Sequence, residues 1–371
     1  MIYLDHGATS FPKPAPVAIA ANRALFTCAN PGRGGHRPAM EAARVVYACR
    51  ERAAELFDCM PEQVVFTSSC THGLNIAIRT LVKPGDQVVI SGFEHNAVLR
   101  PLHGIGARIT VAGRQLFAPE KMIEEFEQAL KKGVKAAVFT HVSNVFGYVL
   151  PVDALCRLCR QYKVPFVIDA AQSAGSLPVQ LRRSGAAFIA MPGHKGLMGP
   201  QGTGLLLCNG DPEPLLLGGT GSNSMDREMP AWLPDRLEAG TLNVPGIAGL
   251  DAGMAWLQQK GMDDIRRREH REAMRCAEGL KRLGVRVFSG EKQAGTVSFV
   301  PPCDCEELAD QLGRQGIAIR AGLHCAPLAH ESAGTLQTGT VRVSFGHDAS
   351  ARQTAALLKH TEIALEKVKK L

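Results

Sequence analysis

Short apolar segments alternate with segments of helical periodicity through the first two thirds of the chain. Residues 136–140 and 165–169 have the pattern of buried strands, whereas residues 119–131 and 151–162 have that of helices. The strands expected in this region are 64–67, 87–90, 107–111, 136–140, 165–169, 186–190 and 204–207. Strands that are apolar throughout and separated by helices indicate a mainly parallel sheet covered on both faces. We therefore predict an α/β fold.

The pattern changes after this region. A long helical stretch over residues 246–283 is highly charged in its middle, which we expect to face solvent. Strands at 285–288, 296–300, 317–320 and 340–344, with helices at 305–315 and from 349, complete the chain. This order predicts a smaller α+β unit. We expect a large domain over residues 14–255 and a small domain that combines residues 1–13 with 256–371, so that the boundary lies inside the long helix.

The composition is that of an ordinary globular protein, with 371 residues, 45% apolar and 21% charged. The net charge is +7, but the basic residues are scattered and aromatic residues make up only 5%, which argues against a nucleic-acid surface. The chain shows neither a signal-peptide pattern nor an apolar run long enough for a membrane, so we expect a cytoplasmic protein. Eleven cysteines, an odd number, are expected to be reduced thiols.

Lys195 follows the expected strand 186–190 in the stretch Pro192-Gly193-His194-Lys195. Burial near the end of a strand disfavours the charged form of a lysine and lowers its pKa. A partly neutral amine is a nucleophile that can form a Schiff base with an aldehyde cofactor. The alternative is a lysine that reaches solvent from the end of a strand, which is the commoner fate of a single lysine.

Three further polar residues follow expected strands. Asp169 could hold a proton on a heterocyclic nitrogen, or it could cap the following turn. Gln172 could donate to a phenolic oxygen of the same ring. His95 could stack on an aromatic cofactor, or satisfy ordinary buried hydrogen bonds.

Residues 67–73, which include Cys70 and Thr71, join a strand to a helix. Small hydroxyl residues and backbone N–H groups at a helix N-terminus suit a phosphate, although ordinary capping explains them too and the spacing is not that of a P-loop. Asn144 lies just after another strand. Because ligands of such sheets bind outside the carboxyl ends of the strands, five strand ends with polar residues indicate one ligand site.

Cys325 lies in a stretch between two strands of the smaller unit, near two cations. Such surroundings favour the thiolate, the reactive form of cysteine. Arg342, on the second of these strands, could bind a carboxylate with its two-pronged guanidinium, or form a surface ion pair.

Four other cysteines form close pairs in the sequence. Cys156 and Cys159 resemble a redox or zinc motif, but they lie within a helical pattern without a second ligand pair, so we expect them to be structural. Cys303 and Cys305 are loop residues to which we assign no role. The sequence predicts no metal site.

With these residues assembled, the chain resembles the class V aminotransferase family, and within it the cysteine desulfurases and selenocysteine lyases. The likeness runs from Tyr3 to Arg342. It rests on six motifs in the family's order: Glu94-His95-Asn96, His141-Val142-Ser143-Asn144, Asp169-Ala170-Ala171-Gln172, Gly193-His194-Lys195, Glu238-Ala239-Gly240-Thr241 and His324-Cys325-Ala326. The resemblance implies the fold type I of enzymes that depend on pyridoxal 5'-phosphate.

The resemblance also implies roles for individual residues. The catalytic residues would be Lys195 as the Schiff-base lysine, His95 on the ring face and Cys325 as the sulfur acceptor. The other cofactor contacts would be Cys70, Thr71, Asn144, Asp169 at the pyridinium nitrogen, Gln172, His194 and Thr241. Thr241 matches a threonine that reaches the phosphate of the neighbouring subunit, which implies a homodimer. The substrate-facing positions would be Asn144, Arg342, His36 and Arg320.

The sequence departs from the family's pattern at three positions. Pro192 stands where many relatives have a phosphate-binding serine, so one hydrogen bond to the phosphate is lost or replaced. Leu323 replaces a frequent histidine beside the active cysteine, and His6 replaces a frequent asparagine. These departures leave the cofactor prediction intact and bear on rate, partner and substrate.

The activity that the resemblance implies is conversion of L-cysteine to L-alanine, with the sulfur held on Cys325 as a persulfide. Only seventeen positions separate Cys325 from Arg342, and a short loop reaches less far, so we expect a dedicated acceptor protein to approach the site. The alternatives are a selenocysteine lyase, a transaminase or epimerase on a small amino acid, and a non-catalytic sulfur-relay protein. A DNA- or RNA-binding module is disfavoured by the scattered charge.

Overall fold

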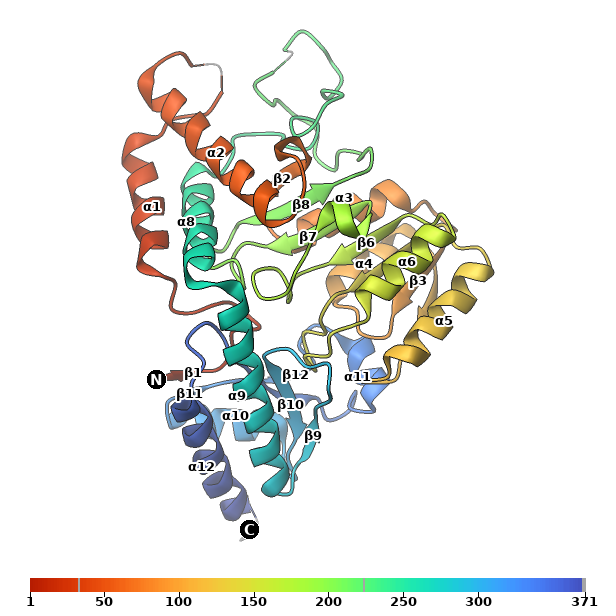
Figure 1. The fold of residues 1–371 in the computed structure, drawn as a ribbon, viewed down its shortest axis with the longest axis vertical. Coiled ribbons are helices and arrows are strands. Elements are labelled where there is room, and N and C mark those ends of the chain that lie inside the picture. The colour runs from red at the N-terminus through yellow and green to blue at the C-terminus, as the bar shows by residue number, and fades with distance from the viewer. Residues whose placement is uncertain (33, 223, 369–371) are drawn as a thin grey trace.

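A seven-stranded sheet forms the centre of the computed structural model, which describes residues 1–32, 34–222 and 224–368 (Figure 1). Its strands are β2 (Val64–Thr67), β3 (Gln87–Ser91), β4 (Arg108–Ala112), β5 (Ala136–Thr140), β6 (Phe166–Asp169), β7 (Phe188–Pro192) and β8 (Gly204–Cys208). They follow the order β2-β8-β7-β6-β5-β3-β4. β8 runs antiparallel to the other six strands of this sheet, which are parallel to one another. The prediction of a mainly parallel sheet is confirmed.

Helices cover both faces of this sheet, as expected for strands that are apolar throughout. They are α1 (Ala15–Thr27), α2 (Arg37–Leu56), α3 (Cys70–Leu81), α4 (Asn96–Ile105), α5 (Pro119–Lys131), α6 (Val152–Gln161), α7 (Leu181–Ser184) and α8 (Val244–Lys260), with a short 3-10 turn η1 (Pro61–Gln63). Successive residues of a strand point to opposite faces, so Val138 packs with α3 and α4 in one apolar cluster and Phe139 with α2, α5 and α6 in another.

The C-terminal part contains a four-stranded antiparallel sheet in the order β12-β13-β10-β9. Its strands are β9 (Arg286–Phe288), β10 (Thr296–Val300), β12 (Arg320–Gly322) and β13 (Thr340–Ser344). The helices of this part are α9 (Met262–Arg282), α10 (Cys305–Arg314), α11 (Pro327–Ala333) and α12 (Ala351–Val368). Figure 1 shows α8 and α9 running one after the other from the large sheet to this part.

The N-terminal strand joins this C-terminal part rather than the large sheet. β1 (Ile2–Tyr3) pairs with β11 (Ile317–Ala318), and Leu4 packs in a third apolar cluster with residues of α9, α10, β10, β13 and α12. This arrangement accords with a small domain that combines the two ends of the chain. The division at residue 255 itself stays a prediction.

Three local predictions differ from the structure. The long helix expected over 246–283 is two helices, because Gly261 (φ +81°) ends α8 and precedes α9. Residues 317–320, expected as one strand, are divided between β11 and β12, which pair in different sheets. Helices α4, α7 and α11 were not predicted, and α4 contains Pro101, a residue that disfavours a helix interior.

The cysteines are all free thiols. Burial raises the pKa of both Cys156 and Cys159 in α6 to about 12, which fits two structural thiols. Cys303 lies in a turn, whereas Cys305 is not a loop residue: it is the buried first residue of α10 and belongs to the third apolar cluster. Within the described residues, every helix is too short or too polar to cross a bilayer.

Candidate active site

A cavity of about 260 Å³ lies where the carboxyl ends of β5, β6 and β7 meet the C-terminal part of the chain. Thr140, Asp169 and Pro192, the last residues of these three strands, all border it. Every site residue predicted from the sequence borders this cavity except His36 and Thr241. The ends of these strands therefore bring most of the candidate residues to one cavity.

Lys195 lies in a tight turn directly after β7. Gly196 is required there, because a side chain would come within 2.2 Å of the carbonyl oxygen of Ala174. Burial, and then the positive charge of Arg342, lower the pKa of the Lys195 ammonium, while Asp169 opposes the shift. The amine is thus less protonated than that of an ordinary surface lysine, as nucleophilic chemistry requires.

Asp169 lies across the cavity at the end of β6 and is only 2% exposed. Its Oδ1 accepts a hydrogen bond from the backbone N–H of Ala171 at 2.8 Å and lies 3.5 Å from the sulfur of Cys70. Burial and this carboxylate hold the pKa of the Cys70 thiol well above its usual value, so the thiol is the donor. Asp169 therefore caps the local turn and also presents a carboxylate to the cavity.

His95 is the N-cap of α4, and its Nδ1 accepts a hydrogen bond from the backbone N–H of Ala97 at 3.0 Å. Burial lowers its pKa, so the imidazole is more readily neutral, and its remaining proton then lies on Nε2. The N–H of Asn96 donates to the carbonyl oxygen of Cys325 at 2.8 Å. This bond joins the start of α4 to the loop that carries Cys325.

Glu94 lies behind His95 and is fully buried. Its Oε1 accepts hydrogen bonds from the hydroxyl of Ser91 and, at 2.9 Å, from the N–H of Thr140, whereas Oε2 has no partner. Burial raises the pKa of Glu94 to about 8. The carboxyl group thus links the ends of β3 and β5. No role was predicted for Glu94, although an acidic residue three positions after an apolar strand was the available signal.

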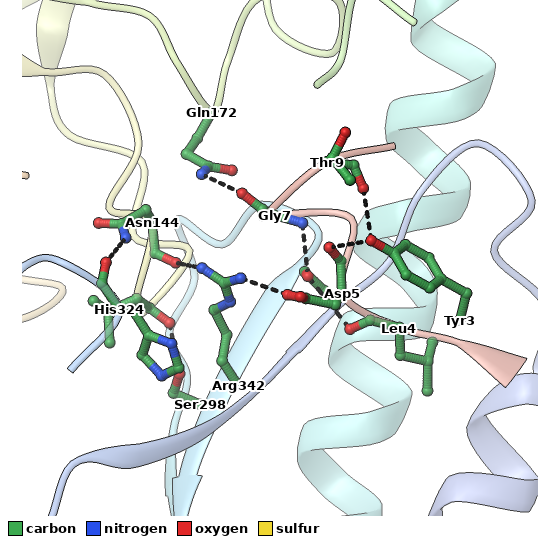
Figure 2. A network of polar contacts seen from close by, with 12 residues as sticks. Tyr3, Leu4, Asp5, Gly7, Thr9, Asn144, Gln172, Ser298, His324 and Arg342 are labelled. Atoms are coloured by element: carbon green, nitrogen blue, oxygen red, sulfur yellow. Dashed lines mark hydrogen bonds and ion pairs between the residues drawn. The ribbon is translucent and has the colours of Figure 1, made fainter. Parts of the chain in front are cut away.

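Arg342 is the centre of a polar network that connects four segments of the chain (Figure 2). It is 2% exposed; Nη2 lies 2.6 Å from Asp5 Oδ1, and Nη1 donates to the carbonyl oxygen of Asn144 at 3.1 Å. The side chain of Asn144 donates in turn to the carbonyl oxygen of His324 at 2.8 Å. The arginine is thus neither a surface ion pair nor free, and its buried Nε still lacks a partner.

The segment between β1 and α1 closes one side of the cavity. Gln172 donates from Nε2 to the carbonyl oxygen of Gly7 at 3.0 Å, and the N–H of Gly7 donates to Ser344 Oγ at 2.8 Å. The sequence drew attention to His6 in this segment, but no role was predicted for Asp5. The partner of Asp5 lies at the other end of the chain, so no local pattern indicated the pair.

Cys325 is exposed in the turn between β12 and α11. Cys325 and His324 both have left-handed backbone angles, with φ of +56° and +49°, which is uncommon for residues other than glycine. The thiol borders the cavity and also an adjoining groove of about 340 Å³ that Arg79 and Arg100 line. Arg320 borders the cavity beside it. The thiolate form of Cys325 stays a prediction.

His194 borders the cavity next to Lys195, and its Nδ1 lies 3.1 Å from Thr9 Oγ1. Burial, with the charges of Lys195 and Lys13, lowers the pKa of His194 to about 4. This imidazole is therefore neutral near pH 7 and contacts other groups through hydrogen bonds alone.

The structure does not bring His36 or Thr241 to this cavity. His36 is exposed and caps α2, where its Nδ1 accepts from the N–H of Ala39 at 3.4 Å. Thr241 borders a separate cavity of about 370 Å³, together with the buried ion pair of Arg50 and Glu238. Its expected contact is with a partner subunit, so that role stays a prediction.

The residues of the cavity fit pyridoxal phosphate. Lys195 offers an amine for the aldehyde, Asp169 a buried carboxylate for the ring nitrogen, and the N-terminus of α3 at Cys70 and Thr71 suits a phosphate. The amine, the carboxylate and the helix N-terminus all border one cavity of about 260 Å³.

Comparison with known proteins agrees with this geometry. The family model described as Aminotransferase class-V matches residues 2–357. A probable cysteine desulfurase of Pyrococcus abyssi is 33% identical, over 93% of this chain and 89% of the relative. A probable cysteine desulfurase of Methanothermobacter thermautotrophicus is 32% identical, over 93% of this chain and 90% of the relative.

Two solved structures are similar over nearly the whole fold. The apo cysteine desulfurase of Thermococcus onnurineus NA1 has a TM-score of 0.91 and 32% identity, covering 100% of this chain and 95% of its own. A cysteine desulfurase of Escherichia coli in an S-sulfonic acid form has a TM-score of 0.86 and 26% identity, covering 98% and 94%.

Replacing Glu94 with Gln is expected to weaken the pH dependence of stability. The native pKa of about 8 exceeds the ordinary 4.5, so the native state holds this proton more tightly than the unfolded chain. The resulting stabilisation is complete below pH 4.5 and is lost as the pH rises through about 8. As the pH rises from 4.5 to about 8, the free energy of unfolding of the variant should therefore increase relative to that of wild type, by at most about 1.4 kcal/mol per pH unit.

Urea denaturation of both proteins across this interval measures the effect. Replacement of the exposed Glu62 with Gln is the matched control and should leave the difference from wild type constant. If the free energy of unfolding of Glu94→Gln also differed from that of wild type by the same amount at every pH, the raised pKa of Glu94 would be contradicted.

Proposed function

We propose, because this chain belongs to the class-V aminotransferase family, that it is a pyridoxal phosphate-dependent cysteine desulfurase. It converts L-cysteine to L-alanine and keeps the sulfur on Cys325 as a persulfide. The observation that carries this proposal is the single cavity bordered by Lys195, Asp169, Arg342 and Cys325. An amine, a ring partner, a carboxylate partner and an accessible thiol are the groups that this reaction needs.

Pyridoxal phosphate, when bound, supplies an electron sink that stabilises negative charge on the substrate's α-carbon. The residues that would hold it are Lys195 at the aldehyde, Asp169 at the ring nitrogen, Gln172 at the ring oxygen, His95 at the ring face, and Cys70, Thr71, Asn144 and His194 as further contacts. His194, whose pKa is lowered to about 4, adds no positive charge to the cavity near pH 7, and burial lowers the pKa of His95 as well; the cations that border the cavity are Lys195, Arg320 and Arg342.

Arg342 is the group that binds the substrate carboxylate. Asp5 holds one end of its guanidinium and the carbonyl oxygen of Asn144 holds the other nitrogen, which fixes the plane of the group at the cavity wall. Its N–H donors outnumber these two acceptors, so it can donate to a further carboxylate in a defined orientation. Lys195, whose pKa is lowered, accepts and returns protons at the substrate carbon.

The thiolate of Cys325 attacks the sulfur of the substrate. An S–S bond forms and the carbon–sulfur bond of cysteine breaks, so that the bonding pair passes to the substrate carbon, which takes up a proton. The products are L-alanine and a persulfide on Cys325, and the cavity opens at this residue into the adjoining groove. The exposure of the thiol supports transfer of the sulfur to an acceptor protein.

The homodimer and the cytoplasmic location are also part of the proposal. Thr241 lies in a cavity apart from Lys195 in its own chain, which supports a contact with the phosphate of a partner subunit. Eleven free cysteines suit a reducing compartment.

The decisive test compares two variants for products from L-cysteine in the presence of dithiothreitol. Cys325→Ala should lower sulfide and alanine release to below about 1% of wild type, because the sulfur acceptor is gone, while it keeps the cofactor's visible absorbance. Lys195→Ala should lose that absorbance as well. Cys303→Ala, outside the cavity, is the control and should match wild type.

Full sulfide release by Cys325→Ala would contradict the persulfide step. Formation of pyruvate on addition of a keto acid, in place of sulfide and alanine, would instead identify a transaminase.

Pro192→Ser is expected to tighten cofactor binding. Proline offers neither a hydroxyl nor an N–H at this edge of the cavity, whereas a serine hydroxyl could donate to a phosphate. One hydrogen bond to a charged group contributes about 1.5–3 kcal/mol, so the dissociation constant should fall by about tenfold or more.

Absorbance titration of the apoprotein with pyridoxal phosphate measures this constant. Pro192→Ala restores the backbone N–H as the serine variant does but adds no hydroxyl, so it is the control for the hydroxyl. Equal affinities for the serine and alanine variants would show that this position does not face the phosphate.

A further inference from the structure

A cluster of three potential metal ligands lies outside the cavity described above. His6 comes from the segment after β1, and His347 and Asp348 come from the turn between β13 and α12. One ligand atom from each residue lies within 4.8 Å of those of the other two. His6 is also the residue that departs from the family's frequent asparagine, and the proposed reaction gives it no task.

The nitrogens of His6 are buried without hydrogen-bond partners. The residue is 8% exposed, and both Nδ1 and Nε2 are buried and unsatisfied. Nε2 approaches Asp348 Oδ1 to 3.2 Å, but this contact lacks the geometry of a hydrogen bond. Nδ1 of His347 is unsatisfied as well. Buried polar atoms left unpaired destabilise the folded state, so a ligand that uses these lone pairs would recover free energy.

The surrounding fold holds these side chains in place. The ring of His6 packs directly on Gly346, where a side chain would come within 2.1 Å of Nδ1. The backbone N–H of His6 donates to the carbonyl oxygen of Ser344 at 3.3 Å. The ring of His347 packs edge-on against both His6 and Trp256, with centroid distances of 5.8 and 5.3 Å. The two imidazoles are thus positioned before any ligand arrives.

We propose that His6, His347 and Asp348 bind a divalent transition-metal ion of the Zn²⁺ type. Two imidazoles and a carboxylate are a common donor set for such ions, with water completing the coordination. Ligand bonds of about 2.0–2.1 Å in a tetrahedron place ligand atoms about 3.3 Å apart, and His6 Nε2 and Asp348 Oδ1 already have this spacing. The other separations between the three ligand atoms are at most 4.8 Å.

A metal ion at this position would tie the N-terminal segment to the start of α12. Asp5 and Gly7, on either side of His6, contact Arg342 and Gln172 at the cavity. The ion would therefore stabilise the wall of the cavity from behind without touching the reacting groups. Sequence analysis predicted no metal, because these ligands lie at opposite ends of the chain and only the fold brings them together. The inference does not depend on the proposed activity.

Equilibrium dialysis of the tag-free holoprotein against Zn²⁺, with metal analysis, tests the proposal. All proteins carry Cys325→Ser, which removes the exposed thiol as a competing ligand. The expected result is one ion per chain, with affinity lowered at least about tenfold by His6→Asn, and a melting temperature that Zn²⁺ raises only when His6 is present. His103→Asn, on the exposed face of α4, is the matched control and should bind as the parent does.

Asp348→Asn keeps the test valid if His6→Asn folds poorly, because this side chain is 40% exposed. Unchanged cofactor absorbance shows that each variant is folded, and the aspartate variant should also lose affinity by about tenfold or more. No stoichiometric Zn²⁺ binding by the parent, or equal binding by both ligand variants, would overturn the proposal and leave an ion pair between His6 and Asp348.

Discussion

The site depends on charged side chains of opposite sign that lie in and beside one cavity. Lys195, Arg342 and Arg320 border it as cations, Asp169 faces them from β6, and Asp5 pairs with Arg342 from the N-terminal segment. Each charge would be costly alone in such surroundings, and together they offset one another. This balance lets a lysine with a lowered pKa, a buried carboxylate and a buried arginine coexist within about 260 Å³.

The same constraint explains why the N-terminal segment belongs to the C-terminal part of the fold. Asp5 pairs with Arg342 on β13, while Gly7 contacts Gln172 after β6 and Ser344 at the end of β13. Removing one partner of a buried ion pair costs about 3–5 kcal/mol. The first residues of the chain are thus held in place by Arg342, the residue proposed to bind the substrate, and they close one side of the cavity.

Much of this could be predicted from the sequence, because parallel strands with apolar residues throughout have a clear local pattern. The bounds of β5, α5, β10 and β13 were predicted without error, and Lys195, Asp169 and His95 were expected together because their strands end at the same edge. Contacts between residues distant in the chain could not be predicted. The pair of Arg342 with Asp5, the role of Glu94 and the cluster around His6 each depend on tertiary packing. Helix α4 was missed although its apolar residues have helical spacing, because a proline at its centre disfavours the prediction of a helix.

The central claim is that Lys195 is the lysine that reacts with the cofactor. Borohydride reduction of the holoprotein, followed by peptide mass mapping, tests it most directly. Lys13 provides an internal comparison, because burial lowers its pKa to about 8 and its Nζ donates to the carbonyl oxygen of His194 at 2.6 Å. The account predicts a pyridoxyl group on Lys195 and none on Lys13. An unmodified Lys195, or a pyridoxyl group on Lys13 in its place, would contradict it.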